Sequence, residues 1–224
     1  MYYASRTGTR RNLDAIGNAG WGLLVSRAGV WRTEAWTCSR TGERRKFKIV
    51  GDNGAWADHM AGREFDEDQF DRFLDWVSSQ PIIPTWLVLP DIVAGGIRSL
   101  ELSVRWSNRC LAVCPLVLLA VQDGMNEQDV APLVGPKVGV FLGGSTQWKI
   151  SNMARWGEFC RLHDLHYHAA RVNTAKRMAA AIAAGANSAD GSSASRYAVT
   201  VPLLHFASRQ LDLLTPRREA NVRL

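Results

Sequence analysis

Five polar or glycine-rich corners follow short apolar runs in this chain, and they carry the residue types best suited to chemistry. The corners hold three carboxylates, one amide side chain and a pair of glycines: Asp52, Asp91, Gln122, Gly143, Gly144 and Asp190. Such apolar runs are typical of strands buried on both faces, and helix-like segments separate most of them. Residues just past the carboxyl ends of barrel strands meet at one mouth, so we expect these six residues to line one pocket.

Two of the carboxylates suit catalytic roles. Asp190 is followed by small residues, which leave its carboxylate accessible, and a carboxylate can attack a sugar C1′ and form a covalent intermediate. Asp52 precedes Asn53 and Gly54, which shape a tight corner, and it suits a general acid/base. The alternative for both is structural, because Asp also caps serine-rich turns and Asp-Asn-Gly is a turn sequence.

The other corner residues suit recognition of a ligand. Asp91 can accept hydrogen bonds from the N–H groups of a heterocycle, and Gln122 can donate and accept at once. Gly143 and Gly144 allow close approach and expose backbone N–H groups to a ligand carbonyl. Together with Asn53, these residues form the expected substrate-binding set.

Two histidines lie two residues apart on a predicted strand, so we expect His166 and His168 to point to one face. Metal sites use such pairs, but no third ligand is evident, and we predict no metal or other cofactor. His168 and Arg171 join the expected substrate contacts, Arg171 as a partner for a phosphate or carboxylate.

The alternation of apolar runs and helical periodicity from residue 85 onward predicts a single (β/α)8 TIM-like barrel over residues 1–224, with an open doubly wound sheet as the alternative. The predicted strands are Gly22–Ser26, Phe47–Val50, Trp86–Leu89, Leu116–Val121, Val138–Leu142, Leu165–Ala170 and Ser188–Ala189, with another near Tyr2–Ala4 or Ala198–Val201. The predicted helices are Phe65–Ser79, Ser99–Ala112, Trp148–His163, Thr174–Ala184 and Thr200–Leu213. We expect residues 216–224 to form a flexible tail.

Composition is that of an ordinary globular protein, with 46% hydrophobic and 21% charged residues. No apolar stretch approaches the roughly 20 residues that span a bilayer, and the N-terminus lacks the apolar core of a signal peptide, so we expect a cytoplasmic protein without membrane contact. The four cysteines are scattered and form no zinc-binding spacing, so we expect reduced, buried thiols.

The net charge of +6 is unevenly distributed. Residues 1–50 carry +7, residues 51–80 carry −6, and the remainder carries +5. The basic N-terminal part, residues 1–48, predicts a phosphate-binding surface, with a solvated basic loop as the alternative. The residues expected to contact nucleic acid are Arg10, Arg11, Arg44, Arg45, Lys46 and Arg196.

The order of the corner residues resembles that of the tRNA-guanine transglycosylase superfamily, over roughly residues 50–196. The resemblance is greatest to its DNA-directed branch, the proteins of phages and bacterial genomic islands that place 7-deazaguanine bases in DNA. It implies an α/β barrel that exchanges guanine for a 7-deazaguanine without breaking the strand. It also implies that Asp190 is the nucleophile at C1′, that Asp52 is the acid/base, and that Asp91, Gln122 and Gly144 hold the base.

The chain departs from the tRNA enzymes in ways that favour DNA over tRNA. It lacks their C-terminal zinc site, and the residues Gly191, Ser192 and Ser193 replace their sequence after the nucleophile. The chain is also much shorter, so we expect a homodimer or a partner subunit to help grip the nucleic acid. The same exchange on tRNA, a non-catalytic nucleic-acid-binding barrel and a metal-dependent hydrolase using His166 and His168 are the alternatives.

Motifs for several other enzyme classes are absent from the sequence. It has no phosphate-binding Walker loop, no Gly-x-Gly-x-x-Gly after a strand, no Gly-x-Ser-x-Gly and no His-Glu-x-x-His. The sequence therefore disfavours nucleotide hydrolysis, dinucleotide redox chemistry and serine hydrolysis.

Overall fold

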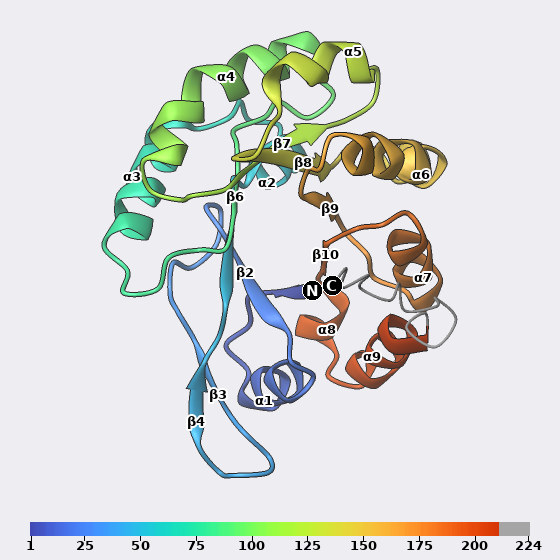
Figure 1. Cartoon of the computed structure of the whole chain (residues 1–224). Coiled ribbons are helices and arrows are strands. Elements are labelled where there is room, and N and C mark those ends of the chain that lie inside the picture. The colour runs from blue at the N-terminus through green and yellow to red at the C-terminus, as the bar shows by residue number, and fades with distance from the viewer. Residues whose placement is uncertain (211–224) are drawn as a thin grey trace, which may run out of the picture.

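The computed structural model describes residues 1–210 and shows eight parallel strands closed into one barrel (Figure 1). The strands are β1 (Tyr2–Ser5), β2 (Gly22–Ser26), β5 (Ile49–Asp52), β6 (Leu87–Val88), β7 (Val117–Val121), β8 (Val138–Leu142), β9 (Tyr167–Ala169) and β10 (Ser188–Gly191). They pair in the order β1-β10-β9-β8-β7-β6-β5-β2, and β2 pairs with β1 to close the ring. The predicted (β/α)8 barrel is confirmed, and the open sheet is excluded.

Helices surround the barrel on its outer side (Figure 1). They are α1 (Arg10–Asn18), α2 (Ala55–Met60), α3 (Glu67–Ser78), α4 (Ile97–Leu111), α5 (Glu127–Val130), η1 (Ala131–Leu133), α6 (Thr146–Leu162), α7 (Ala175–Ala183), α8 (Ser193–Arg196) and α9 (Thr200–Gln210). Helix α3 illustrates why they form, because the Asp66 side chain caps its first turn and Phe70, Phe73 and Val77 bury one face.

The barrel interior is filled by side chains that alternate with those facing the helices. On β2, Leu24 belongs to the interior cluster, whereas Leu23 and Val25 pack in the layer between strands and helices. Tyr3, Leu24, Val50, Trp86, Val88, Leu118 and Ala120 make up the interior cluster. Its upper members, with Phe141, form the floor beneath the mouth.

The predicted elements correspond closely to the observed ones. Each of the seven predicted strands overlaps an observed strand with its ends shifted by at most two residues, and Tyr2–Ala4 is the eighth. The alternative strand Ala198–Val201 is wrong, because α9 begins at Thr200. Each predicted helix is also found, although residues 211–213 of the last helix and the predicted tail 216–224 lie outside the described residues.

A hairpin takes the place of a helix between β2 and β5, and the sequence analysis did not predict it. Its strands are β3 (Ala35–Thr37) and β4 (Arg44–Lys46). The ring of Trp36 lies so close to Gly17 of α1 that a Cβ there would overlap it, and the Thr37 N–H donates to Asp14 at 2.8 Å. Contacts with α1 therefore hold the hairpin against the outer wall.

The basic segment 1–48 is an integral part of the barrel, because it supplies β1 and β2. The four cysteines are free and buried, as predicted. Within the described range, no helix has the length and apolar character needed to cross a bilayer.

Candidate active site

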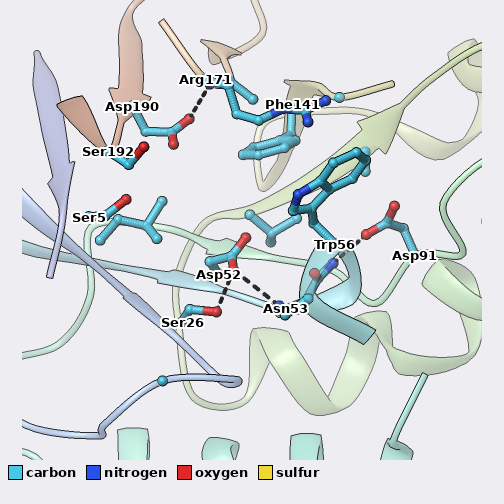
Figure 2. Close-up of a pocket in the computed structure, with 18 of the residues that line it drawn as sticks. Ser5, Ser26, Asp52, Asn53, Trp56, Asp91, Phe141, Arg171, Asp190 and Ser192 are labelled. Atoms are coloured by element: carbon cyan, nitrogen blue, oxygen red, sulfur yellow. Dashed lines mark hydrogen bonds between the residues drawn. The ribbon is translucent and has the colours of Figure 1, made fainter. Parts of the chain in front are cut away.

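The six corner residues line one cavity of about 440 Å³ at the mouth of the barrel. This confirms the expected pocket, whose lining includes Asp52, Asp91, Gln122, Gly143, Gly144 and Asp190. The volume falls within the range of roughly 300 to 1,000 Å³ that is usual for small-molecule sites. Figure 2 shows Asp190 and Asp52 pointing into the pocket from different strands, with Asp91 beyond Asn53.

Asp190 has one carboxylate oxygen held by the protein. Its Oδ1 accepts the backbone N–H of Arg171 at 3.0 Å and lies 3.1 Å from His168 Nε2 (Figure 2 marks the first bond). Its Oδ2 has no hydrogen-bond partner within residues 1–210. The residue is only 8% exposed although it lines the cavity, so a ligand inside the pocket can meet this second oxygen.

Asp52 ends β5 and is suited to hold a proton. Its Oδ2 accepts the Ser26 hydroxyl at 2.7 Å and the Gly54 N–H at 3.1 Å. Burial raises the pKa of Asp52, the Ser26 hydrogen bond opposes this, and the negative charge of Asp190 adds to the rise. The charge of Asp190 therefore acts on the Asp52 carboxyl group at the opposite side of the cavity.

Asp91 lies next to Asn53, which connects it to the Asp52 corner. Asn53 Nδ2 donates to Asp91 Oδ1 at 2.7 Å and to the carbonyl of Leu89 at 2.5 Å. Burial raises the pKa of Asp91 to about 7; the Asn53 bond opposes the rise, and the charge of Asp52 adds to it. This carboxyl group therefore changes its charge near neutral pH.

Arg27 supports the corner formed by Asp52 and Asn53, and it was not selected from the sequence. The side chain is fully buried, its Nε donates to the Asn53 carbonyl at 2.6 Å, and its guanidinium pairs with Asp58. The Arg27 N–H also donates to the Asp52 carbonyl at 2.9 Å. An arginine directly after a strand is the only sequence signal for it.

Gln122 lines the cavity, but its amide is used within the protein. Its Oε1 accepts the Ala94 N–H at 2.6 Å, and its Nε2 donates to the Ile92 carbonyl at 2.8 Å and to Ser99 Oγ at 2.9 Å. Both N–H groups are thereby occupied. The expectation that Gln122 both donates to and accepts from a ligand is therefore corrected: it holds the loop after β6.

The glycine corner is also partly committed. The Gly143 N–H donates to the Val121 carbonyl at 2.9 Å in the strand ladder, so it does not face a ligand as expected. Gly144 has φ +76°, and a Cβ there would lie 2.5 Å from Asp123 Oδ2. Asp123 in turn accepts the Ser145 N–H and hydroxyl, both at 2.7 Å, which fixes the corner.

Arg171 and Trp56 form one wall of the pocket. The guanidinium of Arg171 lies 4.1 Å from the Trp56 ring centroid and donates to the Gly144 carbonyl. Trp56 is 45% exposed and lies beside the pocket in Figure 2. The expected position of Arg171 at the mouth is observed, whereas Trp56 was missed because a lone tryptophan after Asp-Asn-Gly-Ala carries no signal of its own.

The two histidines point to one side, as expected, but they do not face the cavity. His168 is fully buried and absent from the cavity lining, and both its ring nitrogens contact protein atoms. Its predicted role as a substrate contact is therefore corrected. Among residues 1–210, no group of three or more His, Cys, Asp or Glu side chains could hold a metal ion.

The expected nucleic-acid contacts lie on α1, the outer hairpin and α8. Arg196 alone lines the cavity; Arg10 and Arg11 begin α1, and Arg44, Arg45 and Lys46 form β4 on the outer hairpin. Arg6 also lines the cavity and was not selected from the sequence; it pairs with Glu34 at 2.6 Å. Helix α1 lies against both α8 and the hairpin, and Arg10 donates to Thr37, the strand partner of Arg44. The predicted basic residues therefore lie on neighbouring elements, and their contact with nucleic acid stays a prediction.

Comparisons with known proteins support the fold and nothing finer. No protein-family model matches the chain. No curated protein matches it either. Among solved structures, one described as "Native KDPGal structure" matches with a TM-score of 0.50 and 12% identity, over 95% of this chain and 96% of the other. At this identity the likeness shows a shared TIM-barrel fold.

Proposed function

We propose that this protein is a DNA-guanine transglycosylase that exchanges guanine for a 7-deazaguanine base through a covalent Asp190–C1′ intermediate. One observation carries the proposal: among residues 1–210, no group bonds the second carboxylate oxygen of Asp190, which lies at a cavity that also holds Asp52, a carboxyl group with a raised pKa. The order of the corner residues, which resembles that of guanine transglycosylases, supplies the substrate class.

The first half of the reaction would break the bond between sugar and base. Asp190 Oδ2 attacks C1′ of the target nucleotide, the C1′–N9 bond breaks, and its electron pair leaves with guanine. Neutral Asp52 transfers its proton to the departing guanine anion, so a neutral base leaves and Asp52 becomes a carboxylate. The raised pKa of Asp52 favours the protonated form that this step requires.

The second half of the reaction would repeat these steps in reverse order with the incoming base. Asp52 takes the N9 proton of the incoming 7-deazaguanine, N9 attacks C1′, and the bond from C1′ to Asp190 breaks. Each carboxyl group returns to its starting form, so the exchange needs neither a redox cofactor nor nucleotide hydrolysis. The ester preserves the sugar and the strand while the bases change places.

The pocket offers contacts for a purine that has left the helical stack. Ionised Asp91 can accept hydrogen bonds from the N1–H and the exocyclic amino group of guanine. The half-exposed ring of Trp56 offers a flat surface for stacking, and Arg171 lies on that ring. The exposed Arg196 at the rim suits a flanking phosphate.

The test is incorporation of labelled guanine into duplex DNA and, in parallel, into tRNA. Asp190→Asn keeps an oxygen that can accept the Arg171 N–H but removes the nucleophile. We therefore expect the wild type to incorporate label into DNA and this variant to incorporate none. Asp75→Asn is the matched control, because Asp75 lies exposed on α3, outside the cavity. Label in tRNA alone would make tRNA, and not DNA, the substrate. Label incorporated by Asp190→Asn would overturn the mechanism.

A further inference from the structure

Three side chains beneath the pocket form a continuous hydrogen-bonded chain that ends on Asp190. His168 Nε2 lies 3.1 Å from Asp190 Oδ1, and His168 Nδ1 lies 2.9 Å from Ser188 Oγ. Ser188 Oγ in turn lies 2.8 Å from His166 Nε2. The histidines come from the region of β9 and the other two residues from β10, so the chain links two neighbouring strands.

The Asp190 carboxylate at its end gives this series of hydrogen bonds one direction. An ionised carboxylate only accepts, so His168 Nε2 must carry the proton and donate to Asp190. In a neutral ring Nδ1 then accepts, which requires the Ser188 hydroxyl to donate to it and to accept from His166 Nε2–H. Every hydrogen bond in the chain therefore points toward Asp190.

Burial keeps both imidazoles neutral, as this arrangement requires. Burial, with a smaller contribution from the neighbouring His168, lowers the pKa of His166 to about 4. Burial also lowers the pKa of His168, although its contact with Asp190 opposes the shift.

The His168 ring is also fixed in orientation. It stacks on Phe141 with centroids 5.0 Å apart and planes 12° apart, and it meets Trp86 edge-on at 4.5 Å. It is fully buried, so no water competes at its nitrogens from open solvent. A rigid ring with a defined proton position is the usual way to orient a catalytic side chain.

We propose that His168, oriented by Ser188 and His166, is a positioning residue that holds the Asp190 carboxylate with Oδ1 bound and Oδ2 free toward C1′. This inference rests on the proposed function and adds residues that no corner motif contains. With the Arg171 N–H, His168 occupies Oδ1 from two directions, which stops the carboxylate from rotating and leaves Oδ2 for attack.

Two substitutions of His168 separate this role from simple packing. In His168→Gln the side-chain N–H₂ can reach the place of Nε2 and still donate to Asp190. In His168→Asn the shorter side chain reaches only the place of Nδ1, so it keeps the Ser188 contact and loses Asp190. Both replace the same ring with an amide, and their thermal unfolding reports the shared cost in packing.

The first measurement is steady-state base exchange by the full-length variants. We expect His168→Asn to lower kcat about 10- to 100-fold with KM unchanged, as for the loss of one hydrogen bond to a charged group. We expect His168→Gln to restore most of this loss at similar stability. Equal kcat values for the two variants would overturn the positioning role.

The second measurement, histidine ¹⁵N NMR of the wild type, needs no activity. We expect His168 to be the neutral Nε2–H tautomer, assigned by the signal missing in His168→Gln. Ser188→Ala should keep this tautomer, because Asp190 still accepts from Nε2–H, and should shift the Nδ1 signal, because that nitrogen loses its donor. An Nδ1–H or doubly protonated His168 in the wild type would overturn the proposed direction of the hydrogen bonds that lead from His166 to Asp190. Absence of exchange by the wild type, with the expected tautomer, would instead overturn the proposed function and with it the nucleophile that His168 is said to position.

Discussion

Replacing Asp91 by Asn should stabilise the protein at alkaline pH and leave it unchanged in acid. Burial is the main reason that the pKa of Asp91 rises from 3.8 to about 7, a shift of about three units. At about 1.4 kcal/mol per unit, the difference between folded and unfolded states amounts to about 4 kcal/mol. Because the residue is partly exposed to solvent, screening reduces this, and we expect about 2 to 4 kcal/mol.

The sign follows from which state binds the proton more tightly. Below pH 4 the carboxyl group is protonated in both states, so its contribution to stability is fully present. As the pH rises toward 7 the unfolded chain ionises first, and this stability is progressively lost until the folded state ionises too. Asn does not titrate and its oxygen can still accept from Asn53, so Asp91→Asn avoids the loss.

Urea unfolding followed by tryptophan fluorescence between pH 4 and 8.5 measures the difference directly, since the chain has nine tryptophans. Asp123→Asn provides a control of opposite sign. Burial alone would raise the pKa of Asp123, but the N–H and hydroxyl of Ser145 hold it below its ordinary value. We expect this variant to be destabilised throughout this pH range and to approach the wild type only below it, where the Asp123 carboxylate of the folded protein takes up its proton.

Parallel stability curves for wild type and Asp91→Asn across this range would refute the reasoning. They would mean that water or a counter-ion solvates the carboxyl group as well in the folded protein as in the unfolded chain. The same titration bears on the proposed function, because only ionised Asp91 accepts two N–H groups of guanine. Base binding should therefore strengthen as the pH rises through about 7.

Two further substitutions test the pocket and its support. Trp56→Ala should raise KM for the base about 10-fold, because stacking of a base on an aromatic ring contributes about 1 to 3 kcal/mol. Steady-state exchange measures this, and melting should be little changed because the ring is 45% exposed; an unchanged KM would remove Trp56 from the base site. Arg27→Met should destabilise the fold by about 3 to 5 kcal/mol, because Asp58 then faces a neutral side chain and keeps only the exposed Arg63 as a cationic partner. Restoration of stability by adding Asp58→Asn, read by urea unfolding, would confirm that cause, and additive losses would contradict it.

Local pattern was enough to predict most of the barrel. Runs such as Val138–Leu142 are apolar because both faces of the strand are covered, and the stripe of Phe70, Phe73 and Val77 reports the covered face of α3. The hairpin β3–β4 escaped prediction because its position depends on Trp36 meeting Gly17, a contact between residues that no local pattern relates.

The candidate site divides in the same way. The sequence brought Asp52, Asp91 and Asp190 together correctly, because parallel strands of a closed barrel all end at one mouth. The sequence could not show which polar groups at the mouth would remain available to a ligand and which would bond within the protein. Gln122 and His168 have the right chemistry for ligand binding, yet their partners are Ser99 and Ser188.

By itself, therefore, the sequence determined the strands, most of the helices and the set of polar residues at the mouth, since burial and periodicity are local properties of a chain. Tertiary structure alone decided which hydrogen-bonding groups are satisfied within the protein. It bound the amide of Gln122 to a loop, the ring of His168 to the back of Asp190, and Arg27 to the Asn53 corner. These choices depend on distances between residues far apart in the chain, and they leave Asp190 Oδ2 available to the pocket.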